Sequence, residues 1–397
     1  MSASAVEDSS SMKEVEQHDP HPVDKPSSPH KKWKKAALSF IDDQWFLISM
    51  GLVIAIASQV QVPSSQQEVK STTVSYLCVS LIFLATGCTL DTKVLLRNAS
   101  RWKAHLWVQG NCFLTCSALM FGLVSATATS KHFMDPGLLI GLVFLSCVPT
   151  TIASNVVMTG QARGNTELTV VQTSIGNFIG VFLSPALVVM YTTVDTWYNS
   201  VLPPSSTDQF PQIYRRVLMQ LGLSIYVPLL VGQVIRYFFE NACSTVFRKW
   251  KFNKIGSLCM LVIIWSTYDQ AFHSNAFANV KSSNLVFVVF VLLGMWMLYF
   301  SIAFFISNLW FPRRDVISIT YCVAAKGPAF GVPLSNAIFA GIDLELESKI
   351  QVPIVIYAAL QMAFGSILVV IFRKWMQSVE RGRTQRMLEL QQAEQRE

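Results

Sequence analysis

Residues 317–333 read Ile317-Ser-Ile-Thr-Tyr-Cys-Val-Ala-Ala-Lys-Gly-Pro-Ala-Phe-Gly-Val-Pro333, an apolar run that holds one lysine beside glycine and proline. Of the 31 Lys and Arg residues, only Lys326 lies deep inside an apolar segment. An ionisable group in lipid is costly, so by default it marks a functional centre. Because Gly327 and Pro328 follow it, we expect the helix to break there and the ammonium to point at unwound carbonyls.

The first half of the chain carries a second interrupted segment, Cys147-Val-Pro-Thr-Thr-Ile-Ala-Ser-Asn-Val-Val157. Two interrupted apolar segments in corresponding positions of the two halves point to the binding site of a transporter. The pair therefore predicts a membrane transporter built from two related halves.

The composition is typical of a membrane protein. The chain has 397 residues, 52% hydrophobic and 14% charged, and a mean hydropathy of +0.41. These values are too apolar for a soluble protein of this size. The net charge of +7 comes from basic residues in short loops, which indicates topology and excludes nucleic acid as a partner. The eight cysteines show no paired spacing, so neither a disulfide framework nor a metal site is predicted, and no cofactor is expected.

A helix needs about twenty apolar residues to cross the lipid bilayer, and this filter predicts ten spans. They cover residues 44–61, 73–90, 104–128, 137–158, 167–191, 213–239, 255–274, 284–311, 316–341 and 350–374. Spans four and nine contain prolines, which membrane helices tolerate where neighbours satisfy the freed backbone groups. The predicted fold class is an all-α membrane protein with ten transmembrane helices.

The basic residues predict the orientation of these spans. Only Lys70, Lys131, Arg215, Arg216, Lys281 and Lys349 fall on one side, while the other loops and both ends carry nearly all the rest. Because positive charge gathers on the cytosolic side, both termini are predicted to be cytosolic. The N-x-S/T sequence Asn98-Ala-Ser100 is then cytosolic and should carry no glycan.

The layout divides the chain into five parts. These are a disordered cytosolic arm (1–43), a first five-span repeat (44–191), an external loop (192–212), a second five-span repeat (213–375) and a cytosolic tail (376–397). An odd number of spans per half inverts the second half. Spans four and nine thus become symmetry mates, crossed near the midplane at their helix breaks.

Polar residues inside the spans are the candidate binding groups. Unwound carbonyls beside Ser and Asn oxygens suit a cation or a polar solute. The alternative is that these hydroxyls bond to their own helices and let the spans pack closely. The candidates are Gln109, Pro149, Thr150, Ser154, Asn155, Thr169 and Thr173, together with Lys326 and Pro328.

Apart from Glu167 at the first position of span five, Asp269 is the only carboxylate inside a predicted span. It lies near the outer end of span seven, where a role in coupling and a position in a wet vestibule both remain open. No nucleophile elbow, phosphate-binding loop or zinc-protease motif is present, so no catalytic residue is assigned and the protein is predicted not to be an enzyme.

Several motifs resemble the bile acid:sodium symporter family. They are Ile152-Ala-Ser-Asn-Val-Val-Met-Thr-Gly-Gln-Ala-Arg-Gly-Asn165, Leu168-Thr-Val-Val-Gln-Thr173, Leu183-Ser-Pro185 and Trp102-Lys-Ala-His-Leu-Trp-Val-Gln109. With the ten-span order, the resemblance covers nearly all of residues 44–375. Within the family, the sequence is most similar to the branch of solute carrier family ten member seven and the fungal regulators of calcium homeostasis. The resemblance implies a core domain and a panel domain.

Bile acid carriers of this family have two sodium sites. The resemblance matches Ser154, Asn155, Thr169 and Thr173 to ligands of the first site, which also takes a glutamate of span nine. It matches Gln109 to the span-three glutamine of the second site, which also takes Glu and Gln residues of span nine.

The match fails in span nine, where Cys322 stands near the glutamate position and Lys326 near the glutamine position. Two like charges a few ångströms apart repel by several kcal/mol even at an effective dielectric of about 20. We therefore expect no sodium coupling, with the Lys326 ammonium occupying the second cation site. A proton carried by Lys326 is an alternative, since burial disfavours the charged form of a lysine.

The resemblance also implies a function: a multi-pass plasma-membrane protein that negatively regulates calcium uptake and cytosolic calcium homeostasis. In this reading the carrier fold inhibits a partner such as a calcium channel through its cytosolic ends. The alternative is a secondary transporter of a small organic anion or another solute or ion, which affects calcium only indirectly and uses Lys326 as a counter-charge. Relatives in the branch also occupy internal membranes of the secretory pathway, which is the alternative location.

Overall fold

The computed structural model describes residues 45–394, apart from 47, 91–92, 94–96, 99, 132, 204–209, 250–252 and 279. Every regular element in this part of the chain is a helix. Phe46–Glu397 form one structural unit. The predicted cytosolic arm, residues 1–43, lies outside the described residues, as does part of the predicted external loop.

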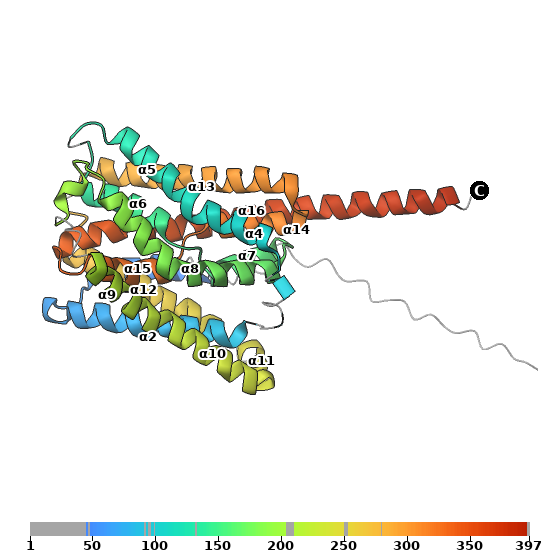
Figure 1. Cartoon of the computed structure of the whole chain (residues 1–397), viewed down its shortest axis with the longest axis horizontal. Helices are drawn as coiled ribbons and strands as arrows, with labels where there is room; N and C mark the ends of the chain where they lie inside the picture. The colour runs from blue at the N-terminus through green and yellow to red at the C-terminus, as the bar shows by residue number, and fades with distance from the viewer. Residues whose placement is uncertain are drawn as a thin grey trace, which may run out of the picture. The chain divides into compact units, whose positions relative to one another are not determined.

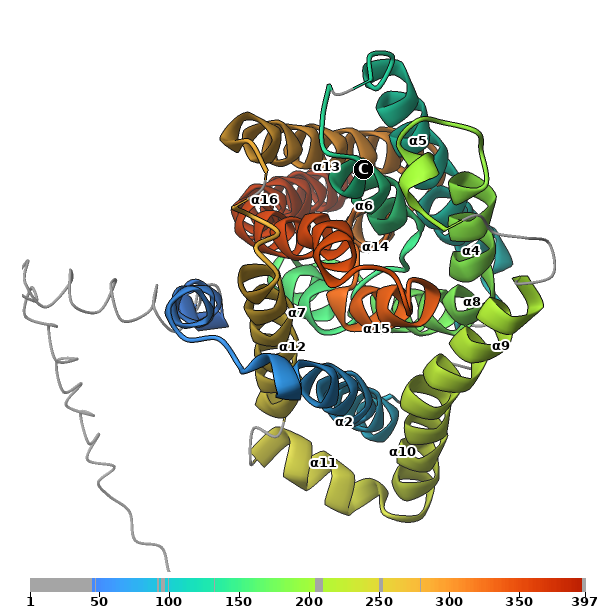
Figure 2. The same ribbon diagram turned by 90° about the vertical axis from the view of Figure 1, so that its left-hand side faces the viewer.

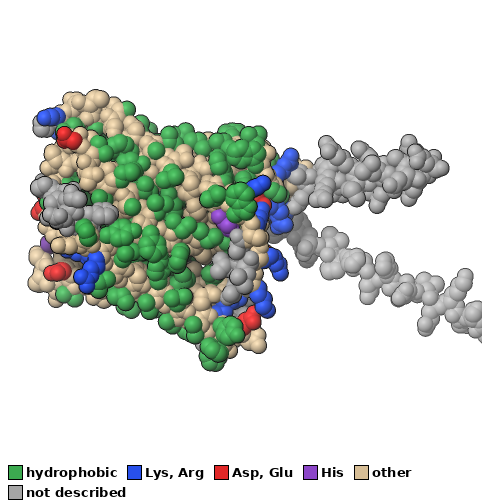
Figure 3. Space-filling model, in the orientation of Figure 1, with side chains coloured by type: hydrophobic (Ala, Val, Ile, Leu, Met, Phe, Trp, Pro, Cys, Tyr) green, Lys and Arg blue, Asp and Glu red, His purple; other side chains and the backbone are tan. Residues whose placement is uncertain are grey.

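Eight helical segments in the described ranges are long and apolar enough to cross a membrane. They are Ser64–Thr89, Trp102–Thr127, Thr166–Thr192, Tyr214–Phe238, Ile255–His273, Ser282–Trp310, Arg313–Ile338 and Leu344–Ser378. Two shorter apolar helices, Ile48–Gln59 and Pro136–Cys147, overlap predicted span one and the first half of predicted span four. Figure 3 shows the corresponding surface, with apolar side chains over the middle and Lys and Arg at the ends. The chain is therefore an all-helical, multi-span membrane protein.

The helices follow one another with short connections (Figure 1). The first half contains η1 (Ser64–Gln66), α2 (Gln67–Thr89), α4 (Trp102–Gln109), η2 (Gly110–Thr115), α5 (Cys116–Thr127), α6 (Pro136–Cys147), α7 (Ala153–Gln161), α8 (Thr166–Thr192) and η3 (Asn199–Val201). The second half contains α9 (Phe210–Leu221), η4 (Gly222–Tyr226), α10 (Val227–Phe238), α11 (Glu240–Lys249), α12 (Asn253–His273), α13 (Ser282–Trp310), α14 (Arg313–Ala324), α15 (Pro328–Ile338) and α16 (Leu344–Glu394). The segments η2 and η4 are π-helical turns within otherwise α-helical spans.

Predicted spans four and nine are each two helices separated by a break. Span four divides into α6 and α7 around residues 148–152, and span nine divides into α14 and α15 around residues 325–327. Proline explains both breaks, because Pro149 and Pro328 have no backbone N–H to continue a helix. Both predicted breaks are confirmed.

Two groups of helices surround these breaks. In Figure 2, α2, α10 and α11 lie along one edge of the molecule with α12 beside α2, while α14 and α15 lie among the remaining helices. Helix α2 packs directly against α10 and α12. The apolar window of Arg313–Ile338 is 100% buried, which makes α14 and α15 the centre of the fold.

The contact between α2 and α10 requires glycine on both sides. A Cβ on Gly87 would lie 2.4 Å from the Leu229 carbonyl oxygen, and one on Gly232 would lie 2.5 Å from the Leu84 carbonyl oxygen. Burial of apolar surface does little to bring helices together in lipid, where the surroundings are equally apolar. Membrane helices therefore pack through small residues, which let their backbones approach this closely. This contact fixes the position of α10 on α2.

Helix α16 extends the last predicted span. It has 51 residues and continues past the membrane-crossing segment Leu344–Ser378 as far as Glu394. The first part of the predicted tail is therefore a continuation of the last span as one helix.

Candidate functional site

The two helix breaks contact each other through their backbones. The Gly327 N–H donates to the Pro149 carbonyl at 2.9 Å. A Cβ on Gly327 would lie 3.3 Å from Thr151 Cα, so a glycine allows the close approach. The ring of Pro149 also packs against Gly180 of α8. A Cβ on Gly180 would lie 2.9 Å from that ring, so a glycine is needed there as well. The predicted crossing of these segments is thus a direct contact of unwound chain.

Lys326 is buried at this crossing, with 1% of its surface exposed. Its Nζ donates to the carbonyl oxygens of Cys112 at 2.7 Å, Ser146 at 2.9 Å and Val148 at 3.0 Å. These bonds use all three ammonium protons. Ser146 and Val148 lie at the C-terminal end of α6, the negative end of the helix dipole. The ammonium is therefore held by backbone dipoles, as expected, and does not reach toward the membrane surface.

The Cys112 carbonyl is available because of the π-helical turn η2. The N–H of Cys116 donates to the carbonyl of Asn111, five residues back, instead of to Cys112. Insertions of this kind release carbonyls from the helix and are frequent at functional sites. Nothing in the sequence around residues 110–115 signalled this contribution.

Gln361 of α16 holds the backbone of Lys326. Its Oε1 accepts from the Lys326 N–H at 2.8 Å, and its Nε2 donates to the Lys326 carbonyl at 2.9 Å. The pair replaces the hydrogen bonds that the broken helix loses at this residue. Gln361 was not among the predicted site residues, although an amide within the apolar span ten was a visible signal.

The polar residues of spans four and five bond mainly to one another. Asn155 Nδ2 donates to Thr150 Oγ1 at 2.7 Å, and Thr169 Oγ1 donates to Thr159 Oγ1 at 3.1 Å. Thr173 instead donates to a carbonyl of its own helix, at 3.0 Å, as the packing alternative expected. Most of these oxygens already have partners within the protein.

The arrangement does not suit a sodium ion. Cys322 presents its sulfur 4.0 Å from the Thr169 carbonyl oxygen, at the position where the resemblance implies a carboxylate. Hard cations prefer charged and neutral oxygen ligands, and a thiol supplies neither. The Lys326 ammonium adds a positive charge to the same region.

Gln109 faces span five. Its Nε2 donates to the backbone and side-chain oxygens of Gln172 at 3.0 and 3.1 Å. Gln109 Oε1 and Gln172 Nε2 remain buried without a hydrogen-bond partner. Because buried amides normally satisfy both ends, this pair offers one acceptor and one donor to a polar occupant.

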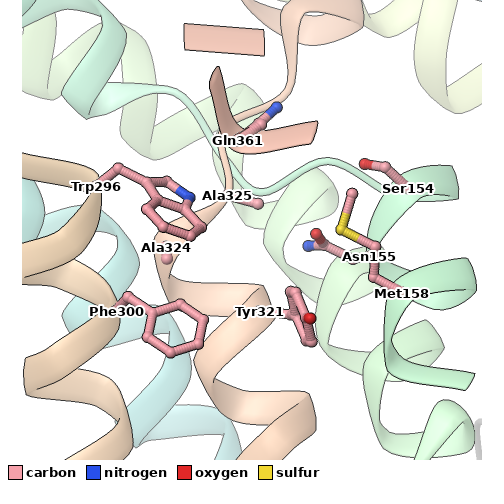
Figure 4. Close-up of a pocket in the computed structure, with 9 residues that line it drawn as sticks. All are labelled: Ser154, Asn155, Met158, Trp296, Phe300, Tyr321, Ala324, Ala325 and Gln361. Atoms are coloured by element: carbon pink, nitrogen blue, oxygen red, sulfur yellow. The ribbon is translucent and has the colours of Figure 1, made fainter. Parts of the chain in front are cut away.

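A small cavity adjoins the crossing. Figure 4 shows Trp296 and Phe300 on one side of it and Ser154, Asn155 and Met158 on the other. Its volume of about 10 Å³ corresponds to about one water molecule. Organic ligands occupy sites of about 300 Å³ or more, so the crossing is closed to an organic solute in this conformation. The lining residues are Ser154, Asn155, Met158, Trp296, Phe300, Tyr321, Ala324, Ala325 and Gln361.

Asp269 lies apart from the crossing and is fully buried, with 0% exposure. It pairs with Lys70 and accepts hydrogen bonds from the Val62 N–H and Gln67 Nε2, both at 2.9 Å. Of the two alternatives left open for Asp269, its burial argues against the wet vestibule. The pair instead joins α12 to α2 and the chain before it.

The turn between α7 and α8 is fastened to α14. Asn165 caps α8 by accepting from the Leu168 N–H at 3.1 Å, and its Nδ2 donates to Asp315 Oδ1 at 2.7 Å. Asp315 also pairs with Arg101, at the start of α4. Asp315 is buried near the start of the helical segment Arg313–Ile338, one residue before the predicted boundary of span nine at 316. The Ala-Arg-Gly-Asn165 motif thus has a structural role.

The sequence has clear relatives. The profile of the SBF-like CPA transporter family matches residues 44–374. Solute carrier RCH1 of Candida albicans is 33% identical over 386 residues, covering 88% of this chain and 93% of that protein. Solute carrier RCH1 of Saccharomyces cerevisiae is 31% identical over 385 residues, covering 87% of each chain. Sodium/bile acid cotransporter 7 of Rattus norvegicus is 28% identical over 358 residues, covering 87% of this chain and 97% of that protein.

These matches confirm the resemblance noted in the motifs, and they extend across both broken helices and the crossing between them. A carrier, with its paired breaks and buried polar groups, fits every part of the site described above. The chain is a membrane solute carrier rather than an enzyme, and it belongs to the SBF-like CPA transporter family.

Proposed function

We propose that this solute carrier works without sodium because the Lys326 ammonium takes the place of a coupling cation. The observation that carries the proposal is the set of three carbonyls, from Cys112, Ser146 and Val148, that accept all three ammonium protons. Rings of carbonyls are also how proteins hold bare monovalent cations. Since no ammonium proton is left over, Lys326 acts on a solute through its charge and not through a direct hydrogen bond.

Sodium binding in a charge-free variant tests this proposal. Lys326→Gln removes the positive charge and adds an amide oxygen, so sodium should raise the melting temperature of the variant and leave that of the parent unchanged. The measurement is thermal unfolding of both proteins in sodium and in choline chloride. Lys103→Gln, which removes an exposed charge, is the control. A Lys326→Gln protein that ignores sodium as the parent does would end the surrogate idea.

We infer further that the carrier restrains calcium uptake indirectly. The family branch that the sequence resembles implies a role in calcium homeostasis, and the similarity to the RCH1 solute carriers supports a carrier. Calcium sites need six to eight oxygen ligands, several of them carboxylates. Within the described residues, the buried carboxylates Asp269 and Asp315 are each already paired, with Lys70 and Arg101. The transported species is then a different solute, and a small organic anion is the alternative function.

The proposed arrangement follows the predicted layout: ten spans in two inverted repeats, a core and a panel domain, and cytosolic termini at the plasma membrane. The paired breaks and their direct contact support this layout. An organic cargo requires the two domains to separate, because the cavity at the crossing holds about one water. If the protein instead regulates a calcium channel, the cytosolic arm and tail are the contacts.

Cytosolic calcium after an external calcium pulse tests the function. In cells that lack the protein, the wild type should damp the spike recorded by a luminescent reporter, and Lys326→Ala at equal surface abundance should not. Lys103→Ala serves as the matched control. Substituting Ser154 and Asn155 should abolish damping if transport is required, whereas deleting residues 1–30 and 380–397 should abolish it if a channel is contacted. Equal damping by wild type and Lys326→Ala would show that the crossing is not needed.

A further inference from the structure

A larger cavity lies away from the crossing, between α2 and the span formed by α9, η4 and α10. Figure 2 shows these helices side by side, and α2 contacts η4 directly. The cavity has a volume of about 390 Å³, within the range of small-molecule sites. Its described lining residues are Tyr76, Gln212, Arg215, Arg216, Met219, Gln220 and Leu223. None of them lines the small cavity at the crossing.

The lining has the chemistry of an anion site. Arg215 and Arg216 are exposed, and neither takes part in the ion pairs found in the described part of the chain. The lining residues that the structure describes include no carboxylate to neutralise them. A guanidinium presents a fork of N–H donors that matches carboxylate, sulfonate and phosphate oxygens. The Gln212 and Gln220 amides add neutral donors.

The same cavity has an apolar wall. Met219 and Leu223 are one helical turn apart, and both are exposed large hydrophobic residues. Tyr76 of α2, with 37% of its surface exposed, completes the opposite side. Two guanidinium groups beside an apolar wall fit a ligand that has an acidic head and a hydrocarbon body.

We propose that this cavity binds an amphipathic anion, with the acidic group on Arg215 and Arg216 and the apolar body on Met219 and Leu223. The site is separate from Lys326 and goes beyond the proposed function. Gln220, which lines the cavity, donates to the Pro333 carbonyl of α15 at 3.4 Å. An occupant therefore lies one side chain away from a broken helix of the crossing. Both a free organic anion and an anionic lipid headgroup have this chemistry.

Binding of a defined probe tests the proposal. The full-length protein in phosphatidylcholine nanodiscs should bind octane-1-sulfonate and not octyltrimethylammonium. Arg215→Gln/Arg216→Gln removes both guanidinium groups and should weaken sulfonate binding about tenfold or more, because hydrogen bonds between charged groups are stronger than those between neutral ones. Arg215→Lys/Arg216→Lys keeps the charge and should lose a smaller part of the affinity. Lys131→Gln/Lys281→Gln removes the same charge from the same predicted side and should bind like the wild type.

Two further measurements distinguish a lipid headgroup from a free organic anion, and this cavity from the crossing at Lys326. If phosphatidylglycerol in the disc competes with the sulfonate in wild type but not in the glutamine double variant, the natural occupant is a lipid headgroup. If it does not compete, the occupant is a free organic anion. Lys326→Ala should keep full sulfonate affinity, so a failure of the sodium-independence proposal leaves this one intact. Equal binding by the wild type and Arg215→Gln/Arg216→Gln, or equal binding of the cationic probe, would overturn the assignment.

Discussion

The side chains of Lys70 and Lys326 both lie largely away from solvent, yet their surroundings differ in one respect. Lys70 pairs with the Asp269 carboxylate and also donates to Gln67 Oε1 at 2.6 Å. Lys326 donates to three neutral carbonyls, and no carboxylate is among its partners. The first arrangement is electrically neutral and ties α2 to α12, whereas the second leaves a net positive charge at the crossing. A buried charge that the fold does not neutralise is the one to associate with function.

Breaking the neutral pair should have the largest effect on stability. Asp269→Ala leaves the Lys70 ammonium buried without its counter-charge, which costs about 3–5 kcal/mol for pairs of this kind. The melting temperature of the purified protein should fall accordingly, and Asp195→Ala, an exposed acidic residue, should change it little. In Lys70→Met/Asp269→Leu both charges are gone, so most of the loss should be recovered. An Asp269→Ala protein as stable as the wild type would show that the pair does not hold these helices together.

Removing the backbone clamp at the crossing should have an intermediate effect. Gln361→Leu leaves the Lys326 N–H and carbonyl without partners in a buried position, at a cost of about 2 kcal/mol. Ser366→Ala, which removes a hydroxyl that bonds within the same helix, is the control. Thermal unfolding checks both variants. If the two substitutions have equal effects, the break does not depend on α16.

Removing the unpaired charge itself should have the smallest effect on stability. Lys326→Met leaves three carbonyls unsatisfied but also removes an ammonium whose burial costs several kcal/mol. These opposing terms should leave the free energy of unfolding within about 1 kcal/mol of the wild type. A loss as large as that of Asp269→Ala would mean that Lys326 is structural, and the contrast between the two lysines would disappear.

The sequence predicted the features that depend on local chemistry. Proline and glycine act on their own backbone, so the breaks beside Pro149 and Pro328 and the burial of Lys326 were foreseeable. The partners of the ammonium were not, because every residue has a carbonyl and only the folded chain selects three of them. Long-range pairing could not be predicted either. Lys70 and Asp269 are 199 residues apart, so the sequence left open whether Asp269 is buried or exposed.

The π-helical turn Gly110–Thr115 has a consequence for evolution and for protein engineering. Deleting one residue there would restore an ordinary helix, return the Cys112 carbonyl to its own chain and rotate the preceding segment Trp102–Gln109 by about 100°. Gln109 would then face away from α8. One of the oxygens that hold the ammonium is thus specified by the length of this span and not by the identity of any side chain in it. A residue-by-residue comparison of relatives would overlook it, whereas a single-residue gap at this position would reveal it.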